Sequence, residues 1–224
     1  MKTILLDIDD TIFDFHNCAK DSIIKSSEEF GISFSPKMFD RYFEQNWKLW
    51  GDYEKGLIER DDIFNIRFPI LFAEFNIKAD GIEFENAFQR HFMNTCSIVD
   101  GANEFIQYLS NKYEVYIVSN SLEKTQRSRL KKAGFDKYFK DIFVSDSVGY
   151  QKPTKEFFNY CFDKLKNVNK SQTIIIGDSL SSDIQGGINA GIKTCWFNPN
   201  KKVNKTKYKA DYEISSLKEI KNIL

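Results

Sequence analysis

Cysteine is scarce and unpatterned in this sequence of 224 residues. No short C-x-x-C spacing joins its four cysteines, so neither a disulfide framework nor a zinc site is indicated. Long apolar runs are missing as well. The run at Ile4 to Leu6 is too short for the core of a signal peptide, and no later run approaches the roughly 20 residues of a membrane span. We therefore expect a reduced, cytoplasmic protein that does not engage a membrane. The cysteines are Cys18, Cys96, Cys161 and Cys195.

An excess of charge of either sign is also absent. Lys and Arg together number 32, as do Asp and Glu, so no overall field attracts nucleic acid or a membrane surface. The lysine-rich stretch 201–209 contains Tyr208 as its one aromatic residue, and we expect it to be a solvated loop. We therefore expect no nucleic acid or membrane partner but a small-molecule one, and we expect a monomer or weak homodimer.

The acidic stretch Asp7-Ile8-Asp9-Asp10-Thr11 follows directly on the apolar run Ile4-Leu5-Leu6. That run predicts a short buried strand, so the acids stand just beyond its carboxyl end, where open α/β sheets build their sites. Asp7 and Asp9 would point the same way in an extended chain. Two like charges in one small volume need a cation or a proton between them. A lone Asp here would be an ordinary helix cap, but three acids and a Thr favour a functional site.

Residues 16–96 show helical spacing without a convincing strand. Gly31 is typical of a helix end, and Ser35-Pro36 of the start of the next helix. Further helices are predicted from about Asp61 and around Phe84, because apolar residues recur there at steps of three and four. We therefore expect a helical domain at 16–96, inserted into a core domain formed by residues 1–15 and 97–224.

Strands alternate with helices in the rest of the chain. Apolar runs at 115–118, 142–144, 173–176 and 194–197 predict four strands beside the first. Alternation of this kind predicts an α/β fold with a doubly wound parallel sheet and right-handed crossovers. A parallel sheet brings the carboxyl ends of its strands together. The polar residues that follow them, Ser119, Asn120, Lys152, Asp178 and Asp183, should therefore meet the N-terminal acids at one edge.

This set of residue types suits phosphoryl transfer. A carboxylate can attack phosphorus to form an aspartyl-phosphate, and Asp7 stands nearest the strand end. Asp9 could give a proton to the leaving alkoxide and later take one from water, for which its surroundings should favour the protonated acid. Lys152 would neutralise negative charge, while Ser119 and Asn120 would bond the phosphoryl oxygens.

Clustered carboxylates without His or Cys favour a hard cation, and Mg²⁺ is the usual one beside a phosphate. The candidate ligands are Asp7, Asp9, Asp178 and Asp183, with Asp7 and Asp178 the leading pair. Asp183 fits better as a residue that orients Lys152 or a bound water. Thr11 could contact the substrate or steady the Asp7 carboxylate.

Together the motifs around Asp7, Ser119, Lys152 and Asp178 resemble the four ordered motifs of the haloacid dehalogenase (HAD) superfamily of phosphotransferases. The resemblance spans the whole chain and implies a magnesium-dependent phosphatase whose helical insertion is a cap that closes over the active site. True dehalogenases of the superfamily lack the second aspartate and the metal, so Asp9 argues against dehalogenation.

Several stretches are similar to the bacterial pyrimidine 5'-nucleotidase subgroup: 34–56, Arg67-Phe68, 149–153 and 183–191. This similarity implies a phosphomonoester substrate, above all a pyrimidine nucleoside 5'-monophosphate. In the insertion, Trp50 is the candidate for stacking on the base, together with Trp47 and Tyr53, and Asn46 or Arg67 could bond the base edges. Aromatic residues at helical spacing are nevertheless more often part of a core.

Other functions remain open at this point. A phosphatase of a sugar phosphate or of phosphoglycolate would differ in the contacts of the insertion alone. A phosphomutase would use the same chemistry but return the phosphoryl group to its substrate. A phosphoacceptor module of the response-regulator receiver kind also carries acids, Thr and Lys at strand ends, but it needs neither a long insertion nor a second carboxylate.

Overall fold

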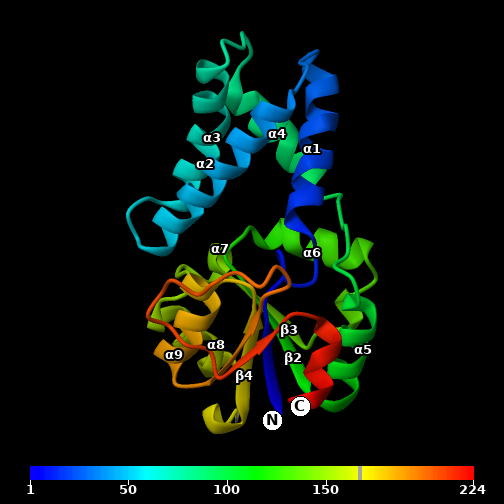
Figure 1. The fold of residues 1–224 in the computed structure, drawn as a ribbon, viewed down its shortest axis with the longest axis vertical. Coiled ribbons are helices and arrows are strands. Elements are labelled where there is room, and N and C mark those ends of the chain that lie inside the picture. Colours follow the sequence, from blue (N-terminus) through cyan, green and yellow to red (C-terminus); the bar gives the residue numbers. More distant parts are fainter. Residues whose placement is uncertain (166–167) are drawn as a thin grey trace. The chain divides into compact units, whose positions relative to one another are not determined.

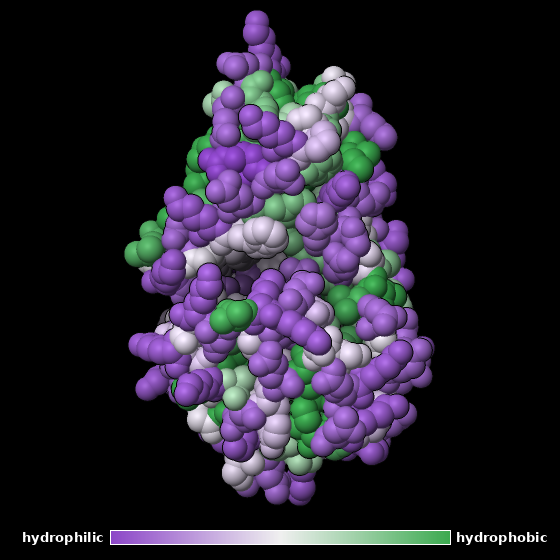
Figure 2. Space-filling view, viewed as in Figure 1, coloured by the Kyte–Doolittle hydropathy of each residue, from purple (hydrophilic) through white to green (hydrophobic). Residues whose placement is uncertain are grey.

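The computed structural model of the protein describes residues 1–165 and 168–224, which form two compact units. The first unit, here the core unit, comprises Met1–Asp14 and Cys96–Leu224, and the second, the helical unit, comprises Phe15–Thr95. Apolar side chains are buried inside each unit, whereas Figure 2 shows mainly hydrophilic side chains on the visible surface. None of the helices in the described residues combines the length and apolar character that a membrane span requires.

A six-stranded parallel sheet forms the centre of the core unit, in the order β3-β2-β1-β4-β5-β6 (Figure 1). Because β1 lies between β2 and β4, the acidic loop that follows β1 emerges in the middle of the sheet edge. The strands are β1 Thr3–Leu6, β2 Glu114–Ser119, β3 Asp141–Val144, β4 Thr173–Gly177, β5 Lys193–Phe197 and β6 Tyr212–Ile214. The predicted parallel α/β sheet is confirmed, but β6 is missing from the prediction because it is short and only its last residue is buried.

Both faces of the sheet are covered, so side chains of β1 alternate between two cores. Ile4 and Leu6 pack with residues of α5 and α6, while Leu5 packs with residues of α8 on the other face. A strand buried on both faces reads as a continuous apolar run, which explains why the sequence revealed it. The helices of this unit are α5 Ala102–Lys112, α6 Glu123–Lys132, α7 Ser145–Val148, α8 Lys155–Lys164 and α9 Gln185–Ala190, with shorter turns η1 Asp136–Tyr138, η2 Lys170–Gln172, η3 Leu180–Ile184 and η4 Leu217–Asn222.

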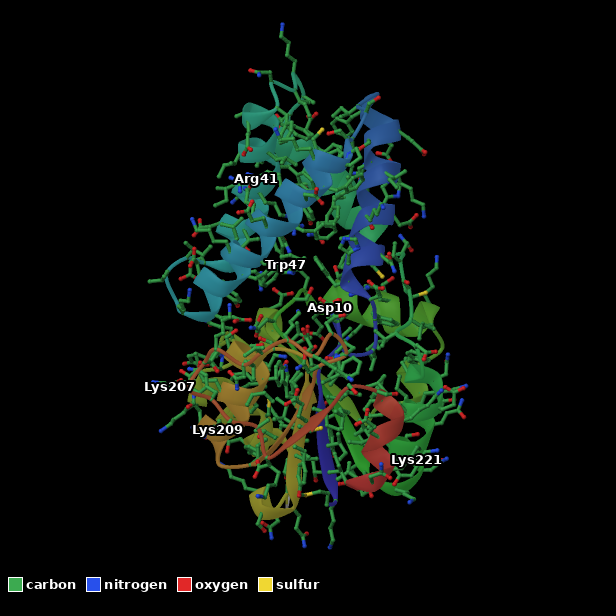
Figure 3. The ribbon with its side chains drawn as sticks, in the orientation of Figure 1. Asp10, Arg41, Trp47, Lys207, Lys209 and Lys221 are labelled. Atoms are coloured by element: carbon green, nitrogen blue, oxygen red, sulfur yellow. The ribbon has the colours of Figure 1, made fainter. Side chains whose placement is uncertain are left out.

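Helix α9 can lie close to the sheet because Gly187 has no side chain. A methyl group at this position would come within 2.5 Å of the Thr194 side chain and 2.6 Å of the Ile175 side chain. The lysine-rich stretch 201–209 lies in the loop between β5 and β6, where Lys207 and Lys209 are labelled in Figure 3. All its lysines are exposed, so the predicted solvated loop is confirmed.

Four helices make up the helical unit: α1 Phe15–Phe30, α2 Pro36–Glu54, α3 Arg60–Glu74 and α4 Gly81–Phe92. The predicted helix ends are confirmed, because Gly31 follows α1 with a φ of 63° and the Ser35 side chain caps α2. The aromatic residues at helical spacing form a core, in which Phe84 and Phe88 pack on Phe68 with ring centroids 4.7 and 5.5 Å apart. The role of the helical unit as a cap stays a prediction.

Candidate active site

The loop after β1 carries the acidic stretch to the carboxyl edge of the sheet. The carbonyl of Ile8 accepts hydrogen bonds from the amides of Thr11 and Phe13, which closes the chain into a tight turn. Asp10, labelled in Figure 3, adopts a left-handed φ of 60° at this turn, a conformation that Asp tolerates better than most residues. This tight turn fixes the backbone positions from which the neighbouring aspartate side chains extend.

Both carboxylate oxygens of Asp7 accept a hydrogen bond. Lys152 Nζ donates to Oδ1 at 2.7 Å, and Thr11 Oγ1 donates to Oδ2 at 3.1 Å. Asp7 is only 7% exposed, so its side chain is held in one orientation at the end of the central strand. The predicted contact between Thr11 and Asp7 is confirmed, while a contact of Thr11 with substrate stays a prediction.

The ammonium group of Lys152 has all three of its protons engaged. Besides Asp7, it donates to Asp183 Oδ1 at 2.7 Å and to the carbonyl of Val118 at 3.0 Å. Burial by itself would lower the pKa of Lys152, but the charges of Asp183 and Asp7 raise it above its usual value, so the group stays positively charged. The predicted pairing of Asp183 with Lys152 is therefore confirmed.

Asp183 is positioned by the turn η3 and by the residue that ends β4. Its Oδ2 accepts a hydrogen bond from the amide of Ser179 at 3.1 Å. A side chain at Gly177 would collide with the Asp183 carboxylate, so only glycine lets the acid approach the sheet this closely. The position of the Asp183 carboxylate therefore explains on steric grounds why residue 177 is a glycine.

Three carboxylates form a cluster, since Asp7, Asp178 and Asp183 each offer one oxygen within 4.8 Å of the others. Burial raises the pKa of Asp7 to about 7, with Lys152 opposing and Asp183 adding to the effect. Burial also raises the pKa of Asp178, together with the charges of Asp10, Asp7 and Asp183. Lys152 supplies one positive charge to three acids, so the cluster has the donor atoms and the surplus negative charge that suit a hard divalent cation.

Asn120 supports Lys152 through the backbone. Its amide nitrogen donates to the carbonyl of Lys152 at 2.9 Å, and its amide oxygen accepts from the backbone N–H of Lys152 at 2.8 Å. Ser119 is buried, and its Oγ accepts hydrogen bonds from Gln126 Nε2 at 3.0 Å and from the amide of Ser121 at 3.2 Å. Direct contacts of Asn120 and Ser119 with a substrate stay predictions.

Asp9 has different partners from Asp7. Arg129 Nη1 donates to Oδ1 and Gln126 Nε2 donates to Oδ2, both at 2.6 Å. The sequence analysis expects surroundings that favour a protonated Asp9. The structure instead places a hydrogen-bond donor at each Asp9 oxygen, and one of these donors is a guanidinium. The described cluster of possible metal ligands contains Asp7, Asp178 and Asp183, so the geometry gives no support to Asp9 as a side-chain ligand.

Gln126 and Arg129 are the residues that the sequence analysis missed. Both lie on α6 and are fully buried, three positions apart on one helix face. Arg127 is equally basic but has a side chain that is 53% exposed. A sequence with polar residues at nearly every position of this helix carries no signal that separates the inward arginine from the outward one.

The candidate substrate-binding residues in the helical unit also divide into buried and more exposed side chains. Arg67 and Asn46 are buried and bonded to each other, Nη1 to Oδ1 at 2.9 Å, which favours an internal role over contact with a base. Trp50 is half-buried and packs edge-on against Tyr53 with ring centroids 5.8 Å apart. Trp47, labelled in Figure 3, is 58% exposed. Stacking of Trp50 on a substrate stays a prediction.

A central-strand aspartate held by a lysine and clustered with two further acids agrees with the resemblance to the haloacid dehalogenase superfamily. Residues 4–197 match the haloacid dehalogenase-like hydrolase family, and the chain belongs to it.

Relatives of known name cover nearly the whole chain. The HAD-hydrolase YfnB of Bacillus subtilis is 40% identical over all of this chain and 95% of its own. Two proteins named as pyrimidine 5'-nucleotidases follow. PynA of Streptococcus pneumoniae is 32% identical over all of this chain and 97% of its own, and YjjG of Escherichia coli is 28% identical over 99% and 96%.

A crystal structure of Bacillus subtilis YfnB, bound to magnesium and described as revealing interdomain movement, matches the fold over all of this chain and 98% of that chain. The TM-score is 0.95 and the identity 39%.

Proposed function

We propose that this protein is a magnesium-dependent phosphatase that hydrolyses pyrimidine nucleoside 5'-monophosphates through an aspartyl-phosphate on Asp7. One observation carries the proposal: Asp7 ends the central strand as a buried carboxylate held by Lys152 and Thr11. The names of PynA and YjjG support the choice of substrate.

In the first step, a carboxylate oxygen of Asp7 attacks phosphorus as the bond from phosphorus to the ester oxygen breaks. The leaving nucleoside oxygen takes a proton from the carboxyl group of Asp9, which becomes a carboxylate. For this step one Asp9 oxygen must carry a proton, so it has to give up the hydrogen bond that it accepts from Arg129 or Gln126. Lys152 keeps Asp7 in place and offsets negative charge near the phosphoryl oxygens, because its ammonium is buried and charged.

In the second step, water attacks the aspartyl-phosphate and the bond between Asp7 and phosphorus breaks. Asp9 takes a proton from that water and so returns to the acid form, and inorganic phosphate leaves. Dividing the reaction in this way replaces one difficult displacement by two easier ones.

The carboxylate cluster fits Mg²⁺. Asp7 and Asp178 are the side chains that we expect to hold it, with Asp183 as the residue that orients Lys152. When bound, the ion would neutralise charge on the phosphoryl oxygens. The magnesium-bound structure of YfnB supports magnesium as the ion. A cytoplasmic location and a monomer or weak homodimer stay predictions.

The test is phosphate release from a panel of esters, each measured with Mg²⁺ and with EDTA. The panel holds UMP, dUMP, dTMP, CMP, AMP, glucose-6-phosphate and phosphoglycolate. We expect release confined to the pyrimidine monophosphates and lost on chelation. Preference for glucose-6-phosphate or phosphoglycolate would keep the chemistry but replace the substrate. Transfer of the phosphoryl group to another position of the substrate, without release, would instead show a phosphomutase.

A further inference from the structure

The three clustered carboxylates differ in how they are held. Asp7 and Asp183 each accept a hydrogen bond at both carboxylate oxygens, one of the two from Lys152. Within the described residues, none donates a hydrogen bond to the carboxylate of Asp178, which is only half-buried. The position of this carboxylate therefore depends on the backbone from which it extends.

The indole of Trp196 holds that backbone. Trp196 Nε1 donates to the carbonyl oxygen of Asp178 at 2.7 Å, and the residue is only 5% exposed. In the register of β4 and β5, Trp196 lies opposite Gly177, which is the last residue of β4. The indole therefore extends the connection between the two strands by one residue, to the residue that carries the carboxylate.

Trp196 is well anchored, because its strand has a neighbour on both sides. It lies opposite Gly177 of β4 and opposite Glu213 of β6. On the far side of Asp178, the carbonyl of Ser179 accepts hydrogen bonds from two amides of the turn η3. A buried indole N–H needs an acceptor, and here the acceptor belongs to the one acid of the cluster whose carboxylate lacks a donor among the described residues.

We propose that Trp196 is a positioning residue that sets the affinity of the carboxylate cluster for Mg²⁺, by fixing Asp178 through its backbone carbonyl. The inference rests on the proposed function, since it requires the cluster to hold Mg²⁺. Groups that orient metal ligands without touching the metal typically contribute about 10- to 100-fold to metal affinity. Removing the indole N–H should therefore weaken metal binding while the nucleophile Asp7 and its partner Lys152 stay in place.

The variant is Trp196→Phe, which keeps an aromatic ring and removes the donor. Tyr108→Phe is the matched control, because Tyr108 Oη donates to the backbone carbonyl of Leu224 at 2.6 Å, a bond of the same kind in the core unit but outside the cluster. Isothermal titration calorimetry of the metal-stripped proteins measures the dissociation constant for Mg²⁺. We expect it to rise about 10-fold in Trp196→Phe and to change less than about twofold in the control.

A second measurement is the dependence of UMP hydrolysis on Mg²⁺ concentration. In Trp196→Phe the half-saturating concentration should rise by the same factor as the dissociation constant, while turnover at saturating Mg²⁺ returns to within about twofold of the wild type. General damage to the fold would instead lower turnover at every concentration. Wild-type Mg²⁺ affinity in a Trp196→Phe protein with a native circular dichroism spectrum, or a loss that excess metal does not recover, would overturn the proposal.

A third measurement needs no substitution at Trp196. The sequence has three tryptophans, so the wild type gives three indole N–H signals in a nitrogen-15 NMR spectrum, and Trp47→Phe and Trp50→Phe identify the other two. Saturating Mg²⁺ should shift the Trp196 signal more than the others, because coupling between two sites is reciprocal. An unchanged Trp196 signal would contradict the inference.

Failure of the proposed function would look different. A wild type that binds Mg²⁺ in calorimetry but releases no phosphate from any ester would remove the proposed reaction, whereas the expected loss of affinity in Trp196→Phe would still support the role of Trp196.

Discussion

Each of the two units contains a buried ion pair with a nitrogen–oxygen distance of 2.7 Å, yet the two pairs have opposite character. In the helical unit, Arg67 donates to both oxygens of Glu85, so one cation meets one anion. In the core unit, Lys152 meets Asp7 and Asp183, with Asp178 close by, so the acids are in excess.

The difference shows how to read buried charge. A buried ion pair with one positive and one negative charge and satisfied hydrogen bonds is part of the packing and needs no further ligand. An excess of one sign in a buried cluster is destabilising unless something else binds there, and such clusters mark functional sites. The raised pKa values of Asp7 and Asp178 express that excess. Substitutions in each unit and the pH dependence of unfolding test this distinction.

The largest effect is expected from Asp7→Asn in the core unit. The amide cannot attack phosphorus, so turnover of UMP should fall at least about a thousandfold. The fold should persist, because the substitution has the same shape and relieves like charges. Initial rates and circular dichroism check both statements. More than a tenth of wild-type activity in a contaminant-free preparation would exclude Asp7 as the nucleophile.

In the helical unit the effect should be on stability. Glu85→Gln leaves the Arg67 charge buried and unpaired, and we expect a loss of about 3 to 5 kcal/mol in the free energy of unfolding, measured with urea. Glu74→Gln is the matched control, since Glu74 pairs with Arg41 at the same 2.7 Å but both side chains are more than a third exposed (Arg41 is labelled in Figure 3). The control should cost less than about 1 kcal/mol. Similar losses in the two variants would mean that burial does not distinguish these pairs.

A stability effect of similar size is expected in the pH dependence of the metal-free core unit. Because the folded-state pKa of Asp7 is about 7 and its ordinary value is 3.8, the folded protein binds more protons than the unfolded chain between those values. Stability from this group is therefore present below about pH 4 and is lost as the pH rises to about 7. Urea unfolding in EDTA should show a decrease of about 4 kcal/mol across this range that is absent from Asp7→Asn. A decrease of equal size in that variant would assign it to other groups.

The sequence predicts the edge of the sheet well because its signals are local. Apolar runs mark the buried strands, and Asp7 and Asp178 stand immediately after two of them, so parallel topology alone brings the acids together. Local signals do not show whether a polar side chain on a helix points into the protein or toward solvent. Arg129 and Arg127 are indistinguishable by composition, although one is buried and the other is exposed.

Inward-facing polar residues of the helical unit are hidden for a related reason. Arg67 occupies a position on α3 where periodicity indicates burial, but a basic residue there is as easily assigned to a substrate contact. Only the presence of Glu85 on a different helix explains it, and such a pairing over eighteen positions has no local signature. Strand β6 was missed because it has only three residues, of which only Ile214 is buried.

The three bonds of the Lys152 ammonium join segments that lie far apart in the sequence. They hold the loop after β1, the strand β2 and the turn η3 together at the sheet edge. An arginine could not make the same three bonds, because its planar guanidinium does not match three acceptors around one point. The helical unit lies in one of the intervals between the tied segments, between β1 and β2 in the chain, so none of the three bonds depends on a residue of that unit.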